Sequence, residues 1–306
     1  NPNLIDFNNF RRGSNLGYIV KNQKLLEIIL NQLKKRKNIN IFDNTKILGV
    51  ENSNEKSTII SNKYKIFSNL NIAADGKNSF VRNFLKTKSF IKKYSKNAMV
   101  CTFSHSKSHK NTAYEFFYNE GPLAILPMQK EKDRNLSSIV WTSDVDYLNK
   151  KFNFKEKNLL PILEKMTMNS VGEITKVYNK QLFPLSAHIN SKFYEKRTIY
   201  IGDSAHSVHP IAGQGWNLGV KDIESLCNIL SKYKSLGIEP GSNFFCKEYH
   251  NDTFYKAYRL YQITDKLDFI FKTNNLPLYF GRVAGSKLIQ NSSKIKNIIS
   301  DFAMGF

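Results

Sequence analysis

The sequence predicts an α/β fold built on a strand–loop–helix unit, interrupted by a sheet-rich segment and completed by helices. A short apolar run at 199–201 stops at Gly202-Asp203, and Gly213-Gln214-Gly215 then opens an amphipathic helix. Between residues 90 and 183, apolar segments of strand length follow one another between turn residues. Beyond residue 249 the apolar residues recur at helical spacing. This combination of strands and helices favours the α/β class.

The composition is that of a protein with a substantial core. The chain has 306 residues and a mass of 35.3 kDa, with 41% hydrophobic and 13% aromatic residues, enough for two domains or one large α/β unit. It has no apolar run of about 18 residues, so no transmembrane helix is predicted. Three widely spaced cysteines, Cys101, Cys227 and Cys246, fit neither a disulfide framework nor a zinc ribbon. A reducing compartment is therefore expected.

The net charge of +21 leaves two interpretations open. The lysines are scattered among asparagines and isoleucines along the whole chain, as in a general compositional bias. A basic face would also attract an anionic membrane surface, by about 1 kcal/mol per lysine. The sequence contains no zinc knuckle and no RNA-binding aromatic pair on a strand, so no nucleic-acid partner is predicted.

The amino-terminal part predicts one helix followed by strands. Apolar residues lie on one helical face within 21–35: Leu26, Ile29, Leu30 and Leu33. Between residues 38 and 72, alternating segments separated by Asn, Ser and Lys clusters predict four strands: NINIFD, TKILGVE, STIIS and YKIF.

A buried strand at 70–74 is expected to run into a turn and a helix. The turn needs Gly76, and Asn78 or Ser79 would cap the helix. Arg82, one turn later, would supply a cation for a phosphate.

The segment from Phe90 to Phe183 predicts a mostly antiparallel sheet. Four strands are expected in sequence: AMVCTFSH, TAYEFFYN, GPLAILPM and NLSSIVWTS. A helix around 154–168 and a further strand near 176–183 follow. Strands that follow one another in this way favour antiparallel pairing.

The stretch from 198 to 230 predicts a ligand site. Asp203, at the carboxyl end of a strand, can accept hydrogen bonds from sugar-like hydroxyls, and glycines at a helix start let a ligand approach the backbone N–H groups. A flavin fits both demands, with its ribityl chain at Asp203 and its ring over residues 213–215. Pro210 would fix a rigid turn in between. Asp222, in the following helix, is interpreted as a solvated or capping acid.

Histidines at 105 and 109 and at 206 and 209 form two pairs, but no metal site is predicted. Zinc needs three or four ligands, and neither pair has a cysteine or carboxylate at ligand spacing.

The dinucleotide fingerprint G-x-G-x-x-G is absent, since Gly213 and Gly215 are followed by Leu218 where a third glycine would fall. A flavin protein should carry that fingerprint in its first βαβ unit. The first methionine is Met99. We therefore expect the chain to be the carboxyl-terminal part of a longer protein.

The stretch GDSAHSVHPIAGQGWNLG, residues 202–219, resembles the GD motif of the class A flavoprotein aromatic hydroxylases, in the branch that hydroxylates ubiquinone precursors. The spacing D-G-x-x-S-x-x-R, residues 75–82, resembles the DG motif of the same family, and LGYIVKNQ, residues 16–23, is similar as well. We call residues 75–82 the DG segment and residues 202–219 the GD segment.

The resemblance implies a set of cofactor-binding residues: Gln23, Asp75, Gly76, Arg82, Gly202, Asp203, Pro210, Ala212, Gly213, Gln214, Gly215 and Asn217. For Gln23, a plain polar residue in the first turn of a surface helix is an equally open interpretation. His206 and His209 are expected to shape the loop beside the flavin, and His105 and His109 to be structural.

The resemblance also implies the domain organisation. Residues 1–88 would hold the remainder of a Rossmann-like FAD-binding domain whose first βαβ unit is missing, and 186–250 would return to that domain. Residues 89–185 would form an inserted substrate domain with a mixed or antiparallel sheet, and 251–306 a helical region. In this family the inserted sheet forms the back wall of the substrate pocket. Strands alternate their faces, so only part of the candidate lining can face a ligand: Tyr114, Phe116, Phe117, Leu123, Ile125, Val140 and Trp141.

The implied function is that of an FAD-dependent monooxygenase. NAD(P)H would reduce the flavin, dioxygen would form a flavin hydroperoxide, and one oxygen would go to the ring of a polyprenylated phenol in ubiquinone biosynthesis. No catalytic acid or base stands out. The expected setting is the cytoplasm, with peripheral contact to the inner membrane and a ubiquinone-biosynthesis complex as further expectations. Two alternatives stay open: an epoxidase or prenyl reductase of the same superfamily, and a non-catalytic lipid-binding scaffold.

Overall fold

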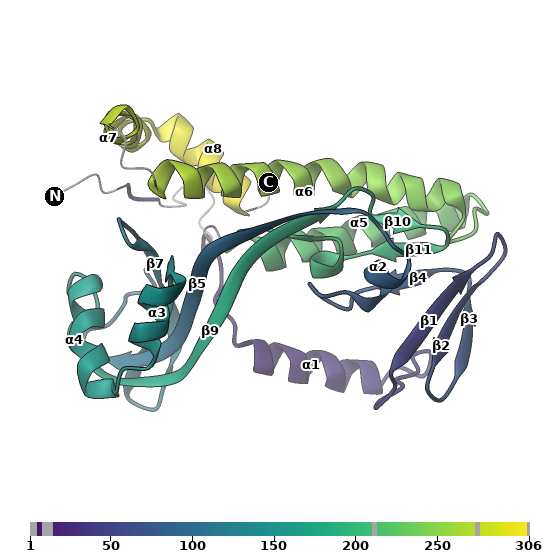
Figure 1. The fold of residues 1–306 in the computed structure, drawn as a ribbon, viewed down its shortest axis with the longest axis horizontal. Coiled ribbons are helices and arrows are strands. Elements are labelled where there is room, and N and C mark those ends of the chain that lie inside the picture. Colours follow the sequence, from purple (N-terminus) through teal and green to yellow (C-terminus); the bar gives the residue numbers. More distant parts are fainter. Residues whose placement is uncertain (1–4, 8–14, 210–212, 273–275, 305–306) are drawn as a thin grey trace. The chain divides into compact units, whose positions relative to one another are not determined.

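The computed structural model describes residues 5–7, 15–209, 213–272 and 276–304, which divide between two compact units (Figure 1). The first unit consists of Asn1–Arg36, Tyr94–Leu185 and Phe269–Phe306, and the second of Lys37–Lys93 and Ser186–Asp268. The chain passes between the two units after Arg36, within two long strands at Lys93–Tyr94 and Leu185–Ser186, and within a long helix after Asp268. The four-part domain division inferred from the sequence stays a prediction.

The second unit contains a small sheet with a parallel strand pair. Its strand order is β10-β11-β4, where β11 is parallel to β4 and antiparallel to β10. The bounds are β4 (Asn71–Ala73), β10 (Tyr194–Glu195) and β11 (Thr198–Tyr200). A short helix, α2 (Phe80–Phe84), follows β4, and a long helix, α5 (Gly215–Ser235), follows the loop after β11.

A second sheet of this unit is an antiparallel meander. It consists of β1 (Ile47–Asn52), β2 (Ser57–Ser61) and β3 (Lys65–Ser68), as the sequence predicts. The strand predicted at NINIFD, residues 38–43, is wrong, because these residues are turn and irregular structure. Ile39 and Ile41 alternate as in a strand but stay about 40% exposed, and no strand of the described residues pairs with them.

The core of the second unit lies between its parallel strands and its two long helices. Tyr200 of β11 and Tyr249 of α6 (Asn243–Lys272) are both fully buried, and the Tyr249 hydroxyl donates to the Tyr200 carbonyl at 3.0 Å. Burying a phenol requires such a partner. The site described below therefore rests on a packed base.

The first unit is dominated by an antiparallel sheet with the strand order β12-β9-β5-β8-β7-β6. The four strands predicted in sequence are all present, and β5 and β9 run for 17 residues each, further than predicted. The bounds are β5 (Ser89–His105), β6 (Tyr114–Tyr118), β7 (Gly121–Glu131), β8 (Arg134–Asp144), β9 (Ile174–Asn190) and β12 (His206–Ser207). β12 belongs by sequence to the second unit.

One face of this sheet packs against two helices. The helices are α3 (Val145–Phe152), which the sequence does not predict, and α4 (Glu156–Met166), which it does. Met99, Phe103 and Trp141 point to the same side and join Leu148 and Leu163 in one buried cluster. The α/β class, with a mainly antiparallel inserted sheet, is confirmed.

The remaining helices of the first unit were predicted from periodicity. They are α1 (Asn22–Lys34), α7 (Leu276–Asn291) and α8 (Ser293–Met304). Neither α1 nor α7 has a buried residue among those described. In the described part of the chain, no helix combines the length and the apolar character needed to cross a membrane.

Candidate functional site

Two parallel strands bring the DG and GD segments together. β4 and β11 are hydrogen-bonded parallel neighbours, and the Ile201 N–H continues the pairing by donating to the Ala73 carbonyl at 3.1 Å. Asp75 follows β4 by two residues, and Gly202-Asp203 begins two residues after β11. Because parallel strands end at the same edge of a sheet, both acids lie at the carboxyl edge, where α/β proteins bind their ligands.

The DG segment is a turn fixed by its own side chains. Gly76 has a φ of +79°, a conformation that favours glycine. The Ser79 hydroxyl caps α2 by accepting from the Arg82 N–H at 2.9 Å, which decides between the two predicted caps. The Asp75 carboxylate accepts from the Val81 N–H at 3.0 Å while its side chain stays exposed.

Arg82 ties the DG segment to the GD segment. Its guanidinium, only 6% exposed, donates to the carbonyls of Lys77 at 2.7 Å and Ser204 at 3.2 Å. It also lies 3.0 Å from Nε2 of His188, on β9. One buried cation therefore links both loops and the long strand between them. Its predicted contact with a phosphate stays a prediction.

His188 is neutral and has a defined tautomer. A guanidinium can only donate, so Nε2 of His188 accepts and Nδ1 carries the proton. Burial lowers the pKa of His188 to about 3, helped by the positive charges of Arg82 and Lys77, while a hydrogen bond to the Asp203 backbone opposes the shift. The positive charge of Arg82 next to the ring disfavours a second positive charge on the imidazole.

The GD segment begins in a short helical turn that presents Asp203. Gly202 has a φ of +57°, and its Cα lies 3.4 Å from where a Cβ on Gly219 would fall, so helix and loop approach closely. The Ser204 hydroxyl accepts from the Ile201 N–H at 3.0 Å. The Asp203 side chain is exposed at the sheet edge, where its carboxylate can accept from a ligand's hydroxyls.

Asp222 is a functional candidate that the sequence did not reveal. It is 2% exposed, so the interpretation as a solvated or capping acid is wrong. Its carboxylate accepts from the Gly202 N–H at 2.9 Å and from Nε2 of His206 at 2.7 Å. The sequence did contain one sign that Asp222 is buried. It lies four residues after Leu218 and four before Leu226, which places it on the buried face of α5. Asp222 therefore holds the turn that presents Asp203.

The start of α5 offers backbone N–H groups at an open surface. Gly213 has a φ of +59°, and no atom of the described residues other than its chain neighbours lies within 4 Å of where its Cβ would be. Gly215 begins the helix, and the Asn217 side chain donates to the Gln214 side chain at 3.1 Å. The positive end of the helix dipole is therefore approachable there. Pro210 and Ala212 lie outside the described residues.

The predicted site residues do not all lie in the same compact unit. Asp75, Gly76 and Arg82 belong to the same compact unit as Gly202, Asp203 and residues 213–217. Gln23 is exposed on α1 in the other unit. Its contact with a cofactor stays a prediction.

The histidines of the first unit have protein partners. The ring nitrogens of His105 lie 2.8 Å from the Lys107 carbonyl and 3.0 Å from the Ser137 hydroxyl. His109 accepts at Nδ1 from the Asn111 N–H, so its Nε2 donates to the Met128 carbonyl. Among the described residues, no three His, Cys, Asp or Glu side chains form a group able to hold a metal.

The residues at the sheet edge fit FAD. Two exposed carboxylates, Asp75 and Asp203, can accept from the hydroxyls of a ribityl chain, and the DG segment carries two positive charges, Lys77 and Arg82, suited to a pyrophosphate. The open backbone at Gly213 lets a planar ring approach the first N–H groups of α5.

Comparison with known proteins identifies the family. A family model described as an FAD binding domain matches residues 12–235. Ubiquinone hydroxylase UbiM of Neisseria meningitidis is 27% identical over 286 residues, which is 93% of this chain and 61% of that protein. Ubiquinone hydroxylase UbiL of Rhodospirillum rubrum is 28% identical over 95% of this chain and 67% of that protein. The chain thus spans about three fifths to two thirds of the length of these relatives.

Solved structures share the fold. PqsL of Pseudomonas aeruginosa, described as a probable FAD-dependent monooxygenase, superposes with a TM-score of 0.71 at 16% identity, covering 87% of this chain and 72% of that one. The p-nitrophenol 4-monooxygenase PnpA of Pseudomonas putida gives 0.72 at 18% identity, over 92% and 71% of the two chains. Together with the family match over most of its length, these findings show that the chain belongs to the family of FAD-binding monooxygenases.

Proposed function

We propose that the protein hydroxylates the ring of a polyprenylated phenol in ubiquinone biosynthesis, with FAD as cofactor, NAD(P)H as reductant and dioxygen as oxygen source. Relatives named ubiquinone hydroxylases support this substrate class. The observation in this structure that carries the proposal is a partly exposed sheet face in the first unit, with an apolar centre around Val140.

This open sheet face lies opposite the face that packs on α3 and α4. On β5, β7 and β8, fully buried residues alternate with partly exposed ones. Val140 lies near the centre of the open face, directly opposite Val100 on one neighbouring strand and Ala124 on the other. The face consists of Val100, Thr102, Glu115, Phe117, Ala124, Leu126, Ser138 and Val140. A surface of this chemistry suits an aromatic ring with an apolar chain.

The strand register also divides the lining residues predicted from the sequence. Phe117 and Val140 lie on the open sheet face. Five others belong to the cluster that packs on the helices: Tyr114, Phe116, Leu123, Ile125 and Trp141. They are core residues.

FAD, when bound, supplies the redox and oxygen-transfer chemistry, so the chain's own residues have binding and positioning roles. Asp203 accepts hydrogen bonds from the cofactor's hydroxyls, and Asp222 and Arg82 hold the loops around it. The open sheet face orients the phenol and keeps water from the ring. No acid or base of the chain is assigned a proton transfer.

The test is the visible absorbance spectrum of the purified protein with FAD, NADPH and a prenylated phenol. We expect a flavin spectrum that bleaches with NADPH, faster when the phenol is present, and a hydroxylated product by mass spectrometry. An epoxide or a reduced prenyl chain as product would favour another enzyme of the superfamily. A folded protein that stays colourless with added FAD would contradict the proposal and favour a lipid-binding scaffold.

Val140→Asp is expected to weaken binding of the phenol and leave binding of the flavin unchanged. A carboxylate at the centre of the open sheet face must lose water when an apolar ring covers it, which should raise the phenol concentration for half-maximal bleaching about tenfold. FAD affinity should stay unchanged, because Val140 belongs to the unit without the DG and GD segments.

The matched control is Phe67→Asp. Phe67 lies on β3, is 66% exposed and also receives a new carboxylate, but on the other unit. This variant should behave as wild type. If Val140→Asp leaves the dependence on the phenol unaltered, the open sheet face does not bind the substrate.

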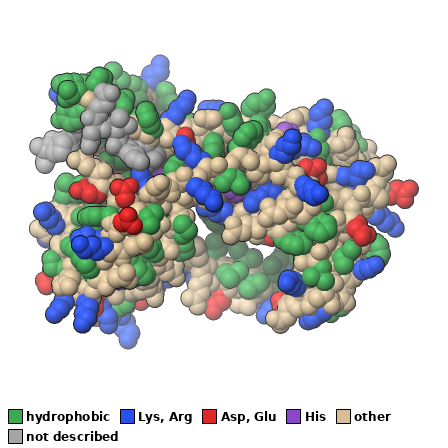
Figure 2. Space-filling view, viewed as in Figure 1, with side chains coloured by type: hydrophobic (Ala, Val, Ile, Leu, Met, Phe, Trp, Pro, Cys, Tyr) green, Lys and Arg blue, Asp and Glu red, His purple; other side chains and the backbone are tan. Residues whose placement is uncertain are grey.

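Peripheral contact with the inner membrane, and with a ubiquinone-biosynthesis complex, would give access to a lipid-soluble substrate. α7 exposes four large apolar side chains beside the exposed Lys287: Leu276, Tyr279, Phe280 and Leu288. Lys and Arg side chains are also spread widely over the visible face in Figure 2. Apolar and basic groups together favour an anionic lipid surface, and co-sedimentation with anionic but not neutral vesicles is the expected result.

A further inference from the structure

The DG segment carries two cations, and the structure gives them different surroundings. Arg82 is 6% exposed, and its guanidinium donates to two backbone carbonyls and lies against His188. Lys77 is only half-buried. The backbone of Lys77 is fixed, because its carbonyl accepts from Arg82 and it follows Gly76 in the turn. Of the two cations, Lys77 is the one whose charge reaches the surface of the site.

The ammonium group of Lys77 is held by the long strand β9. It donates to the Ser186 carbonyl at 2.9 Å, and Ser186 lies within β9. An ammonium has three N–H donors, so this bond leaves it capacity toward a ligand. The contact places the ammonium two residues along β9 from His188, the residue that lies against Arg82.

The electrostatic surroundings of Lys77 suit an anionic ligand. Partial burial lowers the pKa of Lys77, and the carboxylate of Asp203 opposes the shift. Asp203 is the acid expected to meet the ribityl hydroxyls. Arg82 donates to the carbonyls of both Lys77 and Ser204, the residue after Asp203, so the two loops lie together at this site. The Lys77 cation would therefore meet the part of the cofactor that follows the ribityl chain, which is a phosphate.

We propose that Lys77, rather than Arg82, supplies the cation that binds the phosphate end of the flavin cofactor, while Arg82 holds the loops in place. The proposal rests on FAD binding and does not depend on which substrate is hydroxylated. The reason is geometric, since Lys77 is half-buried and keeps N–H donors for a ligand, whereas the buried Arg82 already donates to the carbonyls of Lys77 and Ser204.

The experiment measures the dissociation constants of FAD, FMN and riboflavin on the purified protein freed of its flavin, by flavin fluorescence at two salt concentrations. Lys77→Met removes the charge and keeps most of the stem, and Lys77→Arg keeps the charge. We expect Lys77→Met to weaken FAD and FMN binding about tenfold and riboflavin binding less than about twofold. Lys77→Arg should bind FAD nearly as wild type does. Added salt should weaken FAD binding to the wild type more than to Lys77→Met.

The matched control is Lys65→Met, an exposed lysine of β3 in the same unit, which should alter none of these constants. An equal loss for all three flavins would mean that Lys77 only fastens the loop to Ser186, and would overturn the proposal. Unchanged FAD affinity in Lys77→Met, or a wild type that binds no FAD, would overturn it as well. If the flavin affinities behave as expected and no phenol is hydroxylated, the proposed function fails and this proposal stands.

Discussion

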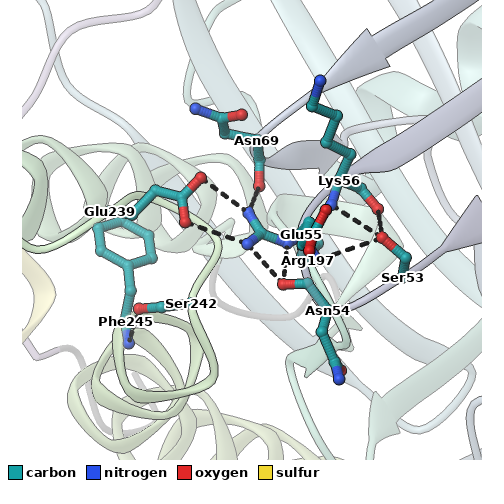
Figure 3. A network of polar contacts seen from close by, with 9 residues as sticks. All are labelled: Ser53, Asn54, Glu55, Lys56, Asn69, Arg197, Glu239, Ser242 and Phe245. Carbon is teal, nitrogen blue, oxygen red and sulfur yellow. Dashed lines mark hydrogen bonds and ion pairs between the residues drawn. The ribbon is translucent and has the colours of Figure 1, made fainter.

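Replacing Arg197 with alanine is expected to lower the free energy of unfolding by about 3 kcal/mol. Arg197 lies in the turn between β10 and β11 and is 5% exposed. Its guanidinium joins three loops of the second unit that are distant in sequence, as Figure 3 shows. Its removal therefore leaves several groups without partners.

Every N–H group of the Arg197 guanidinium donates a hydrogen bond. Nε and one terminal nitrogen donate to the Asn54 carbonyl at 2.8 and 2.6 Å, and the other terminal nitrogen donates to the Asn69 carbonyl at 2.9 Å. The carboxylate of Glu239 accepts from both terminal nitrogens, at 3.2 and 3.1 Å. This pairing lowers the pKa of Glu239. Most of the expected loss comes from the two carbonyls, because Glu239 is half-exposed and water can replace its partner.

Urea unfolding followed by circular dichroism measures the change. Lys196→Ala is the matched control, since it removes a neighbouring exposed cation in the same turn, and it should alter the unfolding free energy by less than about 0.5 kcal/mol. Lys cannot reproduce the fork of Arg, so Arg197→Lys should recover only part of the loss. Equal stability of Arg197→Ala and Lys196→Ala would show that the network contributes nothing.

Much of the local structure of the candidate site was predictable because its signals are local. A strand that ends shortly before Asp75-Gly76, a Ser79 cap and a glycine-rich helix start are each encoded within a few residues, and the structure has all three. The parallel pairing of β4 with β11 is not local, and no pattern in the sequence predicted it. The strands of the inserted sheet were likewise predictable from their alternation.

Residues that act across the fold were not predictable. Asp222 accepts a hydrogen bond from Gly202, 20 positions away, and Arg82 donates one to Ser204, 122 positions away. No spacing in the sequence predicts such contacts. The same holds for the two faces of the inserted sheet, because only the register of β5, β7 and β8 separates Val140 from Trp141. The strand predicted at 38–43 was wrong for a related reason. A strand needs a neighbouring strand to pair with, and an alternating pattern does not show whether one is present.

Acidification is expected to destabilise the second unit through His188. The pKa of this histidine is lowered to about 3, with burial as the main cause and the positive charge of Arg82 as the next. In the unfolded chain the same side chain titrates near its ordinary pKa of about 6.5. Between these values the unfolded chain binds a proton that the folded chain does not.

This difference in bound protons sets the direction in which stability changes with pH. Stability rises with pH wherever the unfolded state binds more protons, so the contribution of His188 is fully present above pH 6.5 or so and is lost as the pH falls toward 3. One proton corresponds to a slope of about 1.4 kcal/mol per pH unit within this window.

His188→Gln isolates the effect. The glutamine carbonyl can still accept from Arg82 and does not titrate, so the variant should fold at pH 8 and lose less stability than wild type on acidification. Urea unfolding at intervals from pH 7 to 4.5 should give wild type the steeper dependence, by about 1 kcal/mol per pH unit. Parallel curves for the two proteins would mean that His188 takes up its proton in the folded state, and that the bond between Arg82 and His188 does not hold the imidazole neutral.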